Sequence, residues 1–354
     1  MQTIVLDMER LRNPYSGLGQ YCLQLGNAFA ANPASESLGF TALVPKGMEG
    51  IFGTKMQYKV VKPWHKWFGM QLPAMVWHCM HQDSGFLPRN RNSQVLYTIH
   101  DLNFLERTDY SNNKKQQKLD AIQRKINKAA GLVYISEYVR TQVHTLLKVQ
   151  ADVLERVIYN GGGHQEDVIK NGEFSSIHDK PFLFSIGIHP KKNYHVLMPL
   201  LAAQKQYDWL IAGPDSRGYK EVIRAAAKQW GVEQRVHFVG PVDASEKWRL
   251  YQQCEALLFP SISEGFGLPV VEAMAVGKPV FLSTKCSLPE VGGTEAYYFE
   301  DFDPETLNKV FVQGMIDYQK DPEKPARLIR WAAQFSWNNA ASQYLEFYKK
   351  LSKR

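Results

Sequence analysis

The chain has 354 residues, of which 44% are hydrophobic and 22% are charged. At about 150 residues per domain this length predicts two domains, and the composition is typical of a folded globular protein. A disulfide-stapled mini-protein, a collagen-like chain and a disordered tail are therefore excluded. The 4 cysteines lie far apart and form no CxxC pair, which excludes a zinc ribbon and a thioredoxin motif and favours a reducing compartment.

The net charge is +7, and most of the excess lies in the first half of the chain. Residues 1–170 carry 20 Lys and Arg against 14 Asp and Glu, whereas residues 171–354 carry 22 against 21. A basic half favours an anionic partner, such as nucleic acid, a phosphorylated small molecule or an anionic membrane surface. A solvated surface with a modest excess of cations explains the same numbers.

The beginning of the sequence, MQTIVLDMERLRNPYSG, has no basic segment followed by a long apolar run. No stretch of the chain approaches about 18 consecutive apolar residues. We therefore expect a cytoplasmic protein that is neither secreted nor inserted into a membrane.

Short apolar runs alternate with longer amphipathic stretches in the first half. Apolar runs rich in β-branched and aromatic residues predict strands at residues 3–8, 40–45, 93–101, 131–136 and 153–163. Amphipathic sequence predicts helices over roughly 18–31, over 111–130 and directly after 136.

The same alternation continues in the second half, with helices expected between the strands. These strands are predicted at residues 181–187, 208–213, 235–240, 255–261 and 277–283. Strand and helix alternation through both halves predicts two α/β domains, each a doubly wound parallel sheet with helices on both faces. We expect an N-terminal domain at 1–165, a second domain at 166–336 and a terminal helix at 337–354. Ligands of such sheets bind beyond the carboxyl ends of the strands.

The most specific string is PSISEGFGLPVVEAMAVGKPV at residues 260–280. Its glycines, Gly265 and Gly267, let backbone N–H groups approach a ligand closely, and Leu268 followed by proline predicts the start of a helix. The N-terminus of a helix in this position can bind a phosphate.

Two glutamates flank this turn. Glu272 is expected about one turn into the helix, where its carboxylate can accept two ribose hydroxyls. Glu264 precedes the turn and can accept hydroxyls of a second sugar. The ordinary alternative is a strand, turn and helix with solvated glutamates.

The string resembles the hallmark of glycosyltransferase family 4, the large retaining family with the GT-B fold, in which seven residues and a glycine turn separate two glutamates. Other segments along nearly the whole chain are similar to motifs of that family: 15–25, 98–102, 131–163, 187–197, 287–293 and 335–348. The resemblance implies two Rossmann-like domains that face a central cleft, near residues 17–20, 100, 191–192 and 264–272. It also implies a last helix that crosses back to the first domain.

By this resemblance the chain transfers a hexose, such as mannose or glucose, from a nucleotide-diphosphate sugar to a glycan or lipid-linked acceptor. The expected context is the biosynthesis of a cell-surface polysaccharide or glycolipid, with no nucleic-acid partner. The expected transfer retains the anomeric configuration and needs no metal or other cofactor, because lysines and helix N-termini can stabilise the leaving diphosphate.

The resemblance also assigns roles to individual residues. His100, Glu264 and Lys192 are the expected catalytic residues, with His100 in polar contact with the donor sugar. The residues expected to bind the nucleotide sugar are Gly17, Gly19, Lys191, Lys192, Gly265, Phe266, Gly267, Leu268 and Glu272. Family members often carry an arginine at one of the two basic positions. A lysine is a point charge and not a bidentate fork, and we give Lys192 more weight than Lys191.

The sequence contains no residue pattern that strongly indicates a metal site. The DxD string at 301–303 precedes a proline and a predicted helix, so Asp303 is expected to cap that helix and not to bind a cation. Asp101, next to His100, has two readings, a functional one and a cap of the following turn. The ligand-type residues at 78–81 have no partner cluster and are expected to pack in the interior.

Residues 59–81 mix aromatic side chains with lysines, a composition that suits the interface of an anionic membrane. The aromatic residues concerned are Trp64, Trp67, Phe68 and Trp77. We expect peripheral contact with the inner face of a membrane through this segment. The alternative is an ordinary helix and loop packed on the sheet.

The residues also bear on three other classes of function besides glycosyl transfer. A Rossmann dehydrogenase fits poorly, because Cys22 stands where GLGQYC would need its third glycine. Another GT-B enzyme, such as an epimerase, and a non-catalytic nucleotide-binding scaffold remain alternatives. The intact set of Glu264, Glu272, Lys192 and His100 favours transfer over both.

Overall fold

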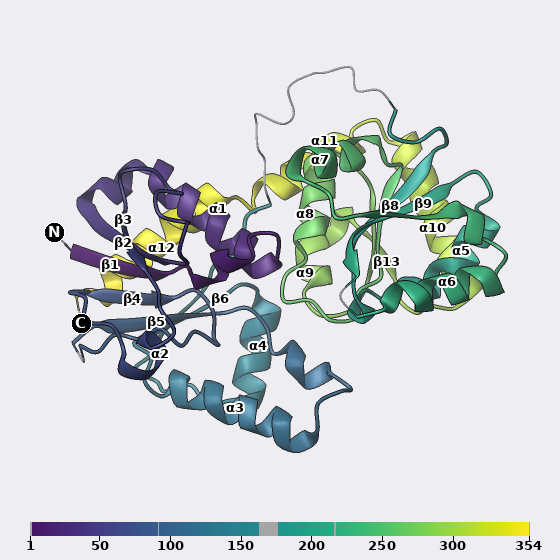
Figure 1. The fold of residues 1–354 in the computed structure, drawn as a ribbon. Helices are drawn as coiled ribbons and strands as arrows, with labels where there is room; N and C mark the ends of the chain where they lie inside the picture. Colours follow the sequence, from purple (N-terminus) through teal and green to yellow (C-terminus); the bar gives the residue numbers. More distant parts are fainter. Residues whose placement is uncertain (1, 91, 163–175, 216, 354) are drawn as a thin grey trace. The chain divides into compact units, whose positions relative to one another are not determined.

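The computed structural model describes residues 2–90, 92–162, 176–215 and 217–353. The chain divides into two compact units (Figure 1). The first unit contains Met1–Gly161 and Ser336–Arg354, and the second contains Gly162–Phe335. The domain boundary expected between residues 165 and 166 lies outside the described residues.

The first unit is built on a sheet of seven parallel strands in the order β3-β2-β1-β4-β5-β6-β7. The strands are β1 Gln2–Asp7, β2 Leu38–Val44, β3 Gln57–Val60, β4 Val76–Cys79, β5 Gln94–Ile99, β6 Gly131–Tyr134 and β7 Leu154–Val157. The helices of this unit are α1 Gly17–Ala31, α2 His65–Phe68, α3 Asn112–Ile126, α4 Glu137–Leu146 and α12 Trp337–Leu351.

Serine residues set the start of four of these helices. Each serine precedes its helix, and its hydroxyl accepts a hydrogen bond from the N–H group three residues later, which satisfies a donor that the helix leaves open. The serines are Ser16 for α1, Ser111 for α3, Ser136 for α4 and Ser336 for α12.

The second unit is built on a sheet of six parallel strands in the order β10-β9-β8-β11-β12-β13. The strands are β8 Phe182–Ile188, β9 Asp208–Asp215, β10 Val236–Gly240, β11 Ala256–Phe259, β12 Val280–Ser283 and β13 Tyr297–Phe299. The helices are α5 Met198–Ala203, α6 Tyr219–Gln229, α7 Ala244–Gln253, α8 Leu268–Ala275, α9 Leu288–Gly292, α10 Pro304–Lys320 and α11 Lys324–Ala333. Two parallel sheets with helices between their strands confirm the predicted fold class.

The strand order reverses once in each sheet. In the first unit the reversal lies between β1 and β4, and in the second it lies between β8 and β11. Loops on the two sides of such a reversal leave the sheet in opposite directions and open a crevice at the carboxyl ends of the strands. These two places are where a ligand site is expected on each unit.

Three strands, β3, β4 and β13, were not predicted from the sequence. β4 is the most important of them, because it pairs with β1 on one side and β5 on the other. It has only four residues, all buried, and one of them is His78. A polar residue in so short a run hides the apolar pattern that identifies a buried strand.

β4 also corrects the expectation for residues 59–81. Trp77 lies in this strand, is fully buried and donates a hydrogen bond from Nε1 to the Phe86 carbonyl at 2.9 Å. It is therefore a core residue and cannot contact a membrane. The exposed part of the segment is the turn around α2, where Trp64, Trp67 and Phe68 are 52%, 86% and 74% exposed.

The last helix returns to the first unit and packs beside α1 (Figure 1). Its Tyr344 hydroxyl lies 2.7 Å from the Tyr21 hydroxyl of α1 and 3.0 Å from Thr98 Oγ1 of β5. His78 bridges the same network, with Nε2 2.7 Å from Thr98 Oγ1 and Nδ1 2.7 Å from the Tyr348 hydroxyl. All five groups are buried, so each hydrogen bond offsets the cost of removing a polar group from water.

None of the helices in the described segments is both long enough and apolar enough to cross a bilayer.

Three buried histidines, His78, His81 and His100, make the stability of the first unit depend on pH. Burial, reinforced by His100, lowers the pKa of His78 from 6.5 to about 3, and burial lowers the pKa of His100 to about 4 despite its bond to the Met80 carbonyl. Both values lie below that of an unfolded histidine, so the unfolded chain binds more protons and stability falls as the pH drops below about 6.5.

Lowering the pH from 7 to 5 should destabilise the first unit by about 2 kcal/mol for each of the rings of His78 and His100. Differential scanning calorimetry at pH 7, 6 and 5 measures this as a falling melting temperature. The His78→Gln variant has no titrating ring at that position and should lose the share of one ring, about 2 kcal/mol, from the dependence. A melting temperature that stays constant or rises toward pH 5 would contradict the assignment.

Candidate functional site

Two loops of the second unit meet at the carboxyl ends of β8 and β11. The loop after β8 contains Lys191 and Lys192, and the loop after β11 contains Ser261 and Glu264. The carbonyl of Lys191 accepts a hydrogen bond from the Ile262 N–H of the other loop at 2.9 Å and lies 3.0 Å from Ser261 Oγ. The backbone therefore fixes the two loops against each other at the point where the strand order reverses.

A buried carboxylate between two lysines forms the centre of this place. Glu264 is 7% exposed, and its two oxygens are bound by different cations. Lys192 Nζ lies 2.7 Å from Oε1, and Lys191 Nζ lies 3.3 Å from Oε2. Ser261 Oγ donates a further hydrogen bond to Oε1 at 2.8 Å. Two cations around one carboxylate leave a net positive charge at the carboxyl edge of the sheet.

Burial and these contacts shift the ionisation of both partners. Burial alone would raise the pKa of Glu264, but the charges of Lys191 and Lys192 and the hydrogen bonds from Lys192 and Ser261 lower it to about 2. Burial lowers the pKa of Lys192 from 10.5 to about 8, although Glu264 opposes the change. Near neutral pH the carboxylate is ionised and Lys192 carries its charge.

An aromatic ring and a closely approaching glycine also hold Lys192 in place. Its ammonium group lies 4.1 Å from the centre of the Phe259 ring, which supplies a cation–π contact. Gly187, at φ +88°, passes so close that a Cβ there would meet Lys192 Cε at 3.3 Å. A side chain at position 187 would therefore strain the backbone and crowd the lysine.

The second glutamate of the motif occupies a separate environment. Glu272 is the fifth residue of α8 and is 9% exposed. Lys247 Nζ lies 2.5 Å from its Oε1, and the Tyr251 hydroxyl donates to its Oε2 at 2.8 Å. Each carboxylate oxygen has a second lone pair, so the group can accept further hydroxyl donors.

Lys247 and Tyr251 were not singled out from the sequence. Both lie on α7, four residues apart and therefore on one face of the helix. The signal that would have found them is this spacing, but a lysine and a tyrosine on one helix face are common and name no partner. Ser261 was missed for the same reason, since a strand-end serine is an ordinary residue.

The glycine turn between the two glutamates is braced on both sides. α8 begins at Leu268 with a proline at its second position, as predicted, and Gly267 precedes it at φ +108°. A Cβ on Gly267 would lie 3.0 Å from Leu288 Cδ2, and Phe266 packs against Phe335. The carbonyl of Phe266 accepts a hydrogen bond from Ser287 Oγ at 2.8 Å.

In the first unit, the predicted residue His100 directly follows β5 and is 5% exposed. Its Nε2 lies 2.8 Å from the Met80 carbonyl, so Nε2 carries the proton and Nδ1 is an acceptor. The ring packs edge-on against Tyr21 of α1, 4.5 Å away. A neutral imidazole with this tautomer suits polar contact with a hydroxyl group and not proton donation near neutral pH.

The two predicted glycines of the first unit differ in their surroundings. Gly17 begins α1 with open space where a Cβ would stand, whereas a Cβ on Gly19 would lie 2.0 Å from the Asn13 carbonyl oxygen. The N–H of Gly19 donates to Ser16 Oγ at 3.1 Å. Gly19 is thus required for the close approach of residues 13–14 to α1.

A third buried carboxylate, Asp7, was not singled out from the sequence. It ends β1, where the strand order of the first sheet reverses, and it is bonded to Ser84 Oγ and to the Glu9 N–H. Burial raises its pKa to about 6 in spite of these hydrogen bonds.

The other polar residues considered in the sequence analysis make hydrogen bonds within the fold. Asp303 caps α10 by accepting from two backbone N–H groups, which confirms the predicted cap. Asp101 accepts from the Asn103 N–H at 3.1 Å, so the capping alternative for this residue is observed. His78 packs in the interior as expected, within the network of α12.

The known families and curated proteins that this chain is similar to are glycosyltransferases. Residues 166–335 match the family model described as glycosyl transferases group 1. O-antigen chain mannosyltransferase B of Escherichia coli is 24% identical over 287 residues, which cover 77% of this chain and 74% of that protein. The serotype-specific mannosyltransferase WbdA of Escherichia coli is 32% identical over 177 residues, which cover 48% of this chain but only 22% of that longer protein. The comparisons support a group 1 glycosyltransferase.

Solved structures give the same answer for the fold. Sucrose-phosphate synthase of Thermosynechococcus elongatus has a TM-score of 0.75 at 18% identity, with 99% of both chains covered. HepE of Anabaena, solved with UDP-glucose, has a TM-score of 0.73 at 17% identity and covers 98% of this chain and 100% of its own. At such identities the likeness shows the fold alone, two Rossmann-like domains of the GT-B type. The functional name of the curated relatives, mannosyltransferase, gives no support to the epimerase or scaffold alternatives.

For a nucleoside diphosphate bound beside Lys192, as proposed below, the ionisation of this lysine predicts how affinity should vary with pH. A bound diphosphate would keep the lysine charged, but the free site loses that charge above about pH 8. The affinity for a nucleoside diphosphate should therefore be roughly tenfold weaker at pH 9 than at pH 7. Calorimetric titration with UDP and GDP between these pH values measures the change. The Lys192→Arg variant stays charged and should show a flat profile, and a flat profile in the unaltered chain would contradict the assignment.

Proposed function

We propose that the chain is a retaining hexosyltransferase that moves a hexose, such as mannose or glucose, from a nucleoside-diphosphate sugar to a glycan or lipid-linked acceptor. The observation that carries the proposal is the pair of lysines held around Glu264 at the carboxyl ends of β8 and β11. The relative named O-antigen chain mannosyltransferase B favours the building of a cell-surface polysaccharide or glycolipid. We place this activity in the cytoplasm and assign no nucleic acid as partner.

The lysines suit the stabilisation of a leaving diphosphate. When the bond between sugar and diphosphate breaks, negative charge grows on the phosphate oxygens, and fixed cations nearby lower the barrier. Lys192 is buried and Lys191 is about one-third exposed, so at least one of the two charges acts in a region of low dielectric. With two lysines and the N-terminus of α8 on the same unit, the proposed transfer needs no metal ion and no other cofactor.

The two glutamates divide the recognition of the donor. Glu264 is ionised over the whole neutral range, so it cannot act as a general acid. It is suited to accept sugar hydroxyls and to stabilise the positive charge that develops on the sugar. Glu272, held by Lys247 and Tyr251, is suited to accept ribose hydroxyls, which do not change during the reaction.

In the first unit, we assign His100 to polar contact with the transferred sugar through Nδ1. Gly17 lies exposed at the start of α1, and we assign its backbone to contact with the donor. We keep Gly19 in the proposal as the residue that lets the preceding loop approach α1.

The proposed activity is tested with four nucleotides and their sugars. A thermal-shift panel of UDP, GDP, ADP and TDP should identify one base that raises the melting temperature by mass action. Transfer from the corresponding mannose and glucose donors is then followed by NMR in EDTA, and the product should keep the anomeric configuration of the donor. An inverted product would contradict the retaining mechanism. Activity lost in EDTA and restored by manganese would contradict the metal-free mechanism, and no response to any nucleotide would overturn the function itself.

Changing each of the two glutamates to alanine should impair a different property, nucleotide affinity in one case and turnover in the other. Glu272→Ala should weaken the donor and the free nucleoside diphosphate alike, because the ribose contact is the same in both. The loss of a charge-assisted hydrogen bond, about 1.5–3 kcal/mol, corresponds to roughly 10- to 150-fold in affinity. Glu264→Ala should reduce turnover at saturating donor and leave binding of the free nucleotide nearly intact.

Calorimetry with the nucleotide and initial rates at saturating donor separate the two outcomes. Glu300→Ala, an exposed glutamate of the same unit, serves as the matched control and should change neither quantity. If Glu264→Ala loses nucleotide affinity while Glu272→Ala loses only turnover, the two roles are reversed.

We further propose that the turn around α2 contacts an anionic membrane surface. Its exposed aromatic residues are Trp64, Trp67 and Phe68, and Lys62 Nζ lies 4.9 Å from the Trp64 ring. Aromatic rings beside lysines suit the region of the lipid headgroups, where the ring is half-buried and the cation meets anionic lipid. Such contact would bring a lipid-linked acceptor to the first unit.

The Trp67→Ser, Phe68→Ser double variant should bind vesicles containing phosphatidylglycerol at least about tenfold more weakly than the unaltered chain. Co-sedimentation measures this binding, with phosphatidylcholine vesicles as the neutral comparison. Trp230→Ser, a partly exposed tryptophan of the second unit, should have no effect. Equal binding by the double variant would exclude this turn as the contact.

A further inference from the structure

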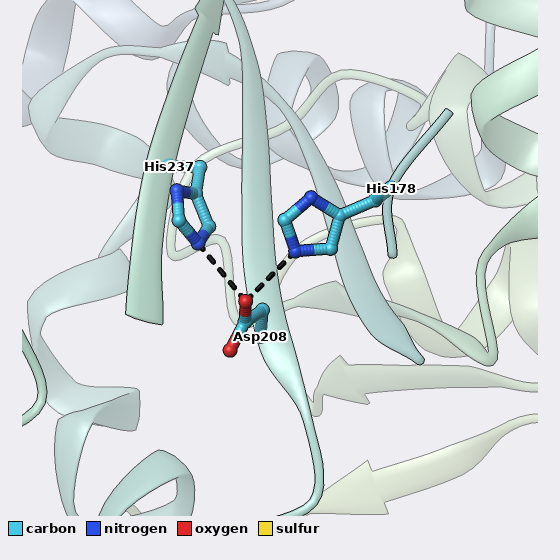
Figure 2. A group of neighbouring side chains, drawn as sticks. All are labelled: His178, Asp208 and His237. Carbon is cyan, nitrogen blue, oxygen red and sulfur yellow. Dashed lines mark hydrogen bonds and ion pairs between the residues drawn. The ribbon is translucent and has the colours of Figure 1, made fainter. Parts of the chain in front are cut away.

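Three side chains gather at the amino edge of the second sheet (Figure 2). His178 lies in the segment that leads into β8, Asp208 is the first residue of β9, and His237 is the second residue of β10. The strands are parallel, so this edge is opposite to the one that carries Lys192 and Glu264. The cluster therefore belongs to no part of the proposed donor site.

The ligand-type atoms of the cluster converge on one carboxylate oxygen. His178 Nε2 lies 2.8 Å from Asp208 Oδ2, and His237 Nε2 lies 3.1 Å from the same atom. One nitrogen or oxygen from each residue lies within 4.8 Å of the others. Ligands of a tetrahedral zinc ion, at bonds of about 2.0–2.2 Å, stand about 3.3 Å apart. Shifts of a few tenths of an ångström would bring the two measured separations to that value.

The backbone holds these side chains in place. The Asp208 N–H donates to the Pro181 carbonyl at 3.0 Å, immediately before β8. His237 pairs with Leu210 across the sheet, which places it on the same face as Asp208. The His178 ring packs edge-on against Phe182 and lies 4.9 Å from the His237 ring.

The chemistry of the group fits a cation. Asp208 is 5% exposed, and its other oxygen, Oδ1, is buried and finds no hydrogen-bond donor among the described residues. Lys180 Nζ lies 4.0 Å from Oδ1, at the limit of an ion pair. The His237 side chain is 39% exposed and that of His178 is 22% exposed, which leaves a route for an ion and room for water as a further ligand.

We propose that His178, Asp208 and His237 form a site for one divalent transition-metal ion, best matched by Zn²⁺. Two imidazoles and one carboxylate are ligands that such ions prefer over Mg²⁺ or Ca²⁺. The ion would tie the segment before β8 to β9 and β10 and so stabilise the second unit. The proposal is independent of the transferase function, because the donor site at the opposite edge contains none of these residues.

The full chain, stripped with a chelator and dialysed, is titrated with ZnSO₄ in a calorimeter. We expect one ion per chain, visible absorption of the tetrahedral type when Co²⁺ replaces Zn²⁺, and a melting temperature roughly 5–10 °C higher at zinc concentrations 100-fold above the dissociation constant. His178→Ala, His237→Ala and Asp208→Asn should each weaken binding at least about tenfold.

The matched control is His144→Ala, which removes a histidine paired with a carboxylate, Glu155, in the first unit. It should leave zinc affinity unchanged. Circular dichroism verifies that each variant is folded, and His237→Gln, at the more exposed position, replaces any variant that is not. Failure of the unaltered chain to bind Zn²⁺, or binding that persists at the same affinity in both histidine variants, overturns the proposal and leaves a hydrogen-bonded triad.

Discussion

A carboxylate buried as deeply as that of Glu264 stays ionised only if cations surround it. Removing one ion from water costs several kcal/mol, and here two lysines and a serine hydroxyl provide the compensation. The compensation requires the loops after β8 and β11 to meet, and the hydrogen bond from the Ile262 N–H to the Lys191 carbonyl holds them together. The charge that suits a diphosphate is thus a by-product of the way in which the second unit keeps one carboxylate in its interior.

The two glutamates of the motif show how one sequence pattern produces two environments. Glu264 precedes the turn and faces the loop after β8, whereas Glu272 lies within α8 and faces α7. The turn between them reverses the chain, so carboxylates only eight positions apart meet different lysines.

Most of the correct predictions from the sequence rested on signals that lie close to the predicted feature in the chain. The start of α8 followed from Gly267 and the proline after Leu268, and the cap of α10 followed from Asp303, because both signals lie within a few residues of their effect. The central strand β4 was missed because the partners of His78 come from distant segments, including Tyr348, 270 residues away. Lys247 and Tyr251 were missed for the same reason, since only the packing of α7 on α8 gives them a role.

The return of α12 to the first unit constrains the order in which the two units can complete their folding during synthesis. Tyr21 reaches its partner Tyr344 across 323 positions of the chain, so α12 is made only after the whole of the second unit. Domains fold as they leave the ribosome, the earlier segment usually first. Here the unit that begins the chain waits for its last buried helix, while the inserted second unit can close beforehand. A nascent first unit therefore exposes the apolar surface that α12 will cover, and its folding completes by a contact of very high sequence separation.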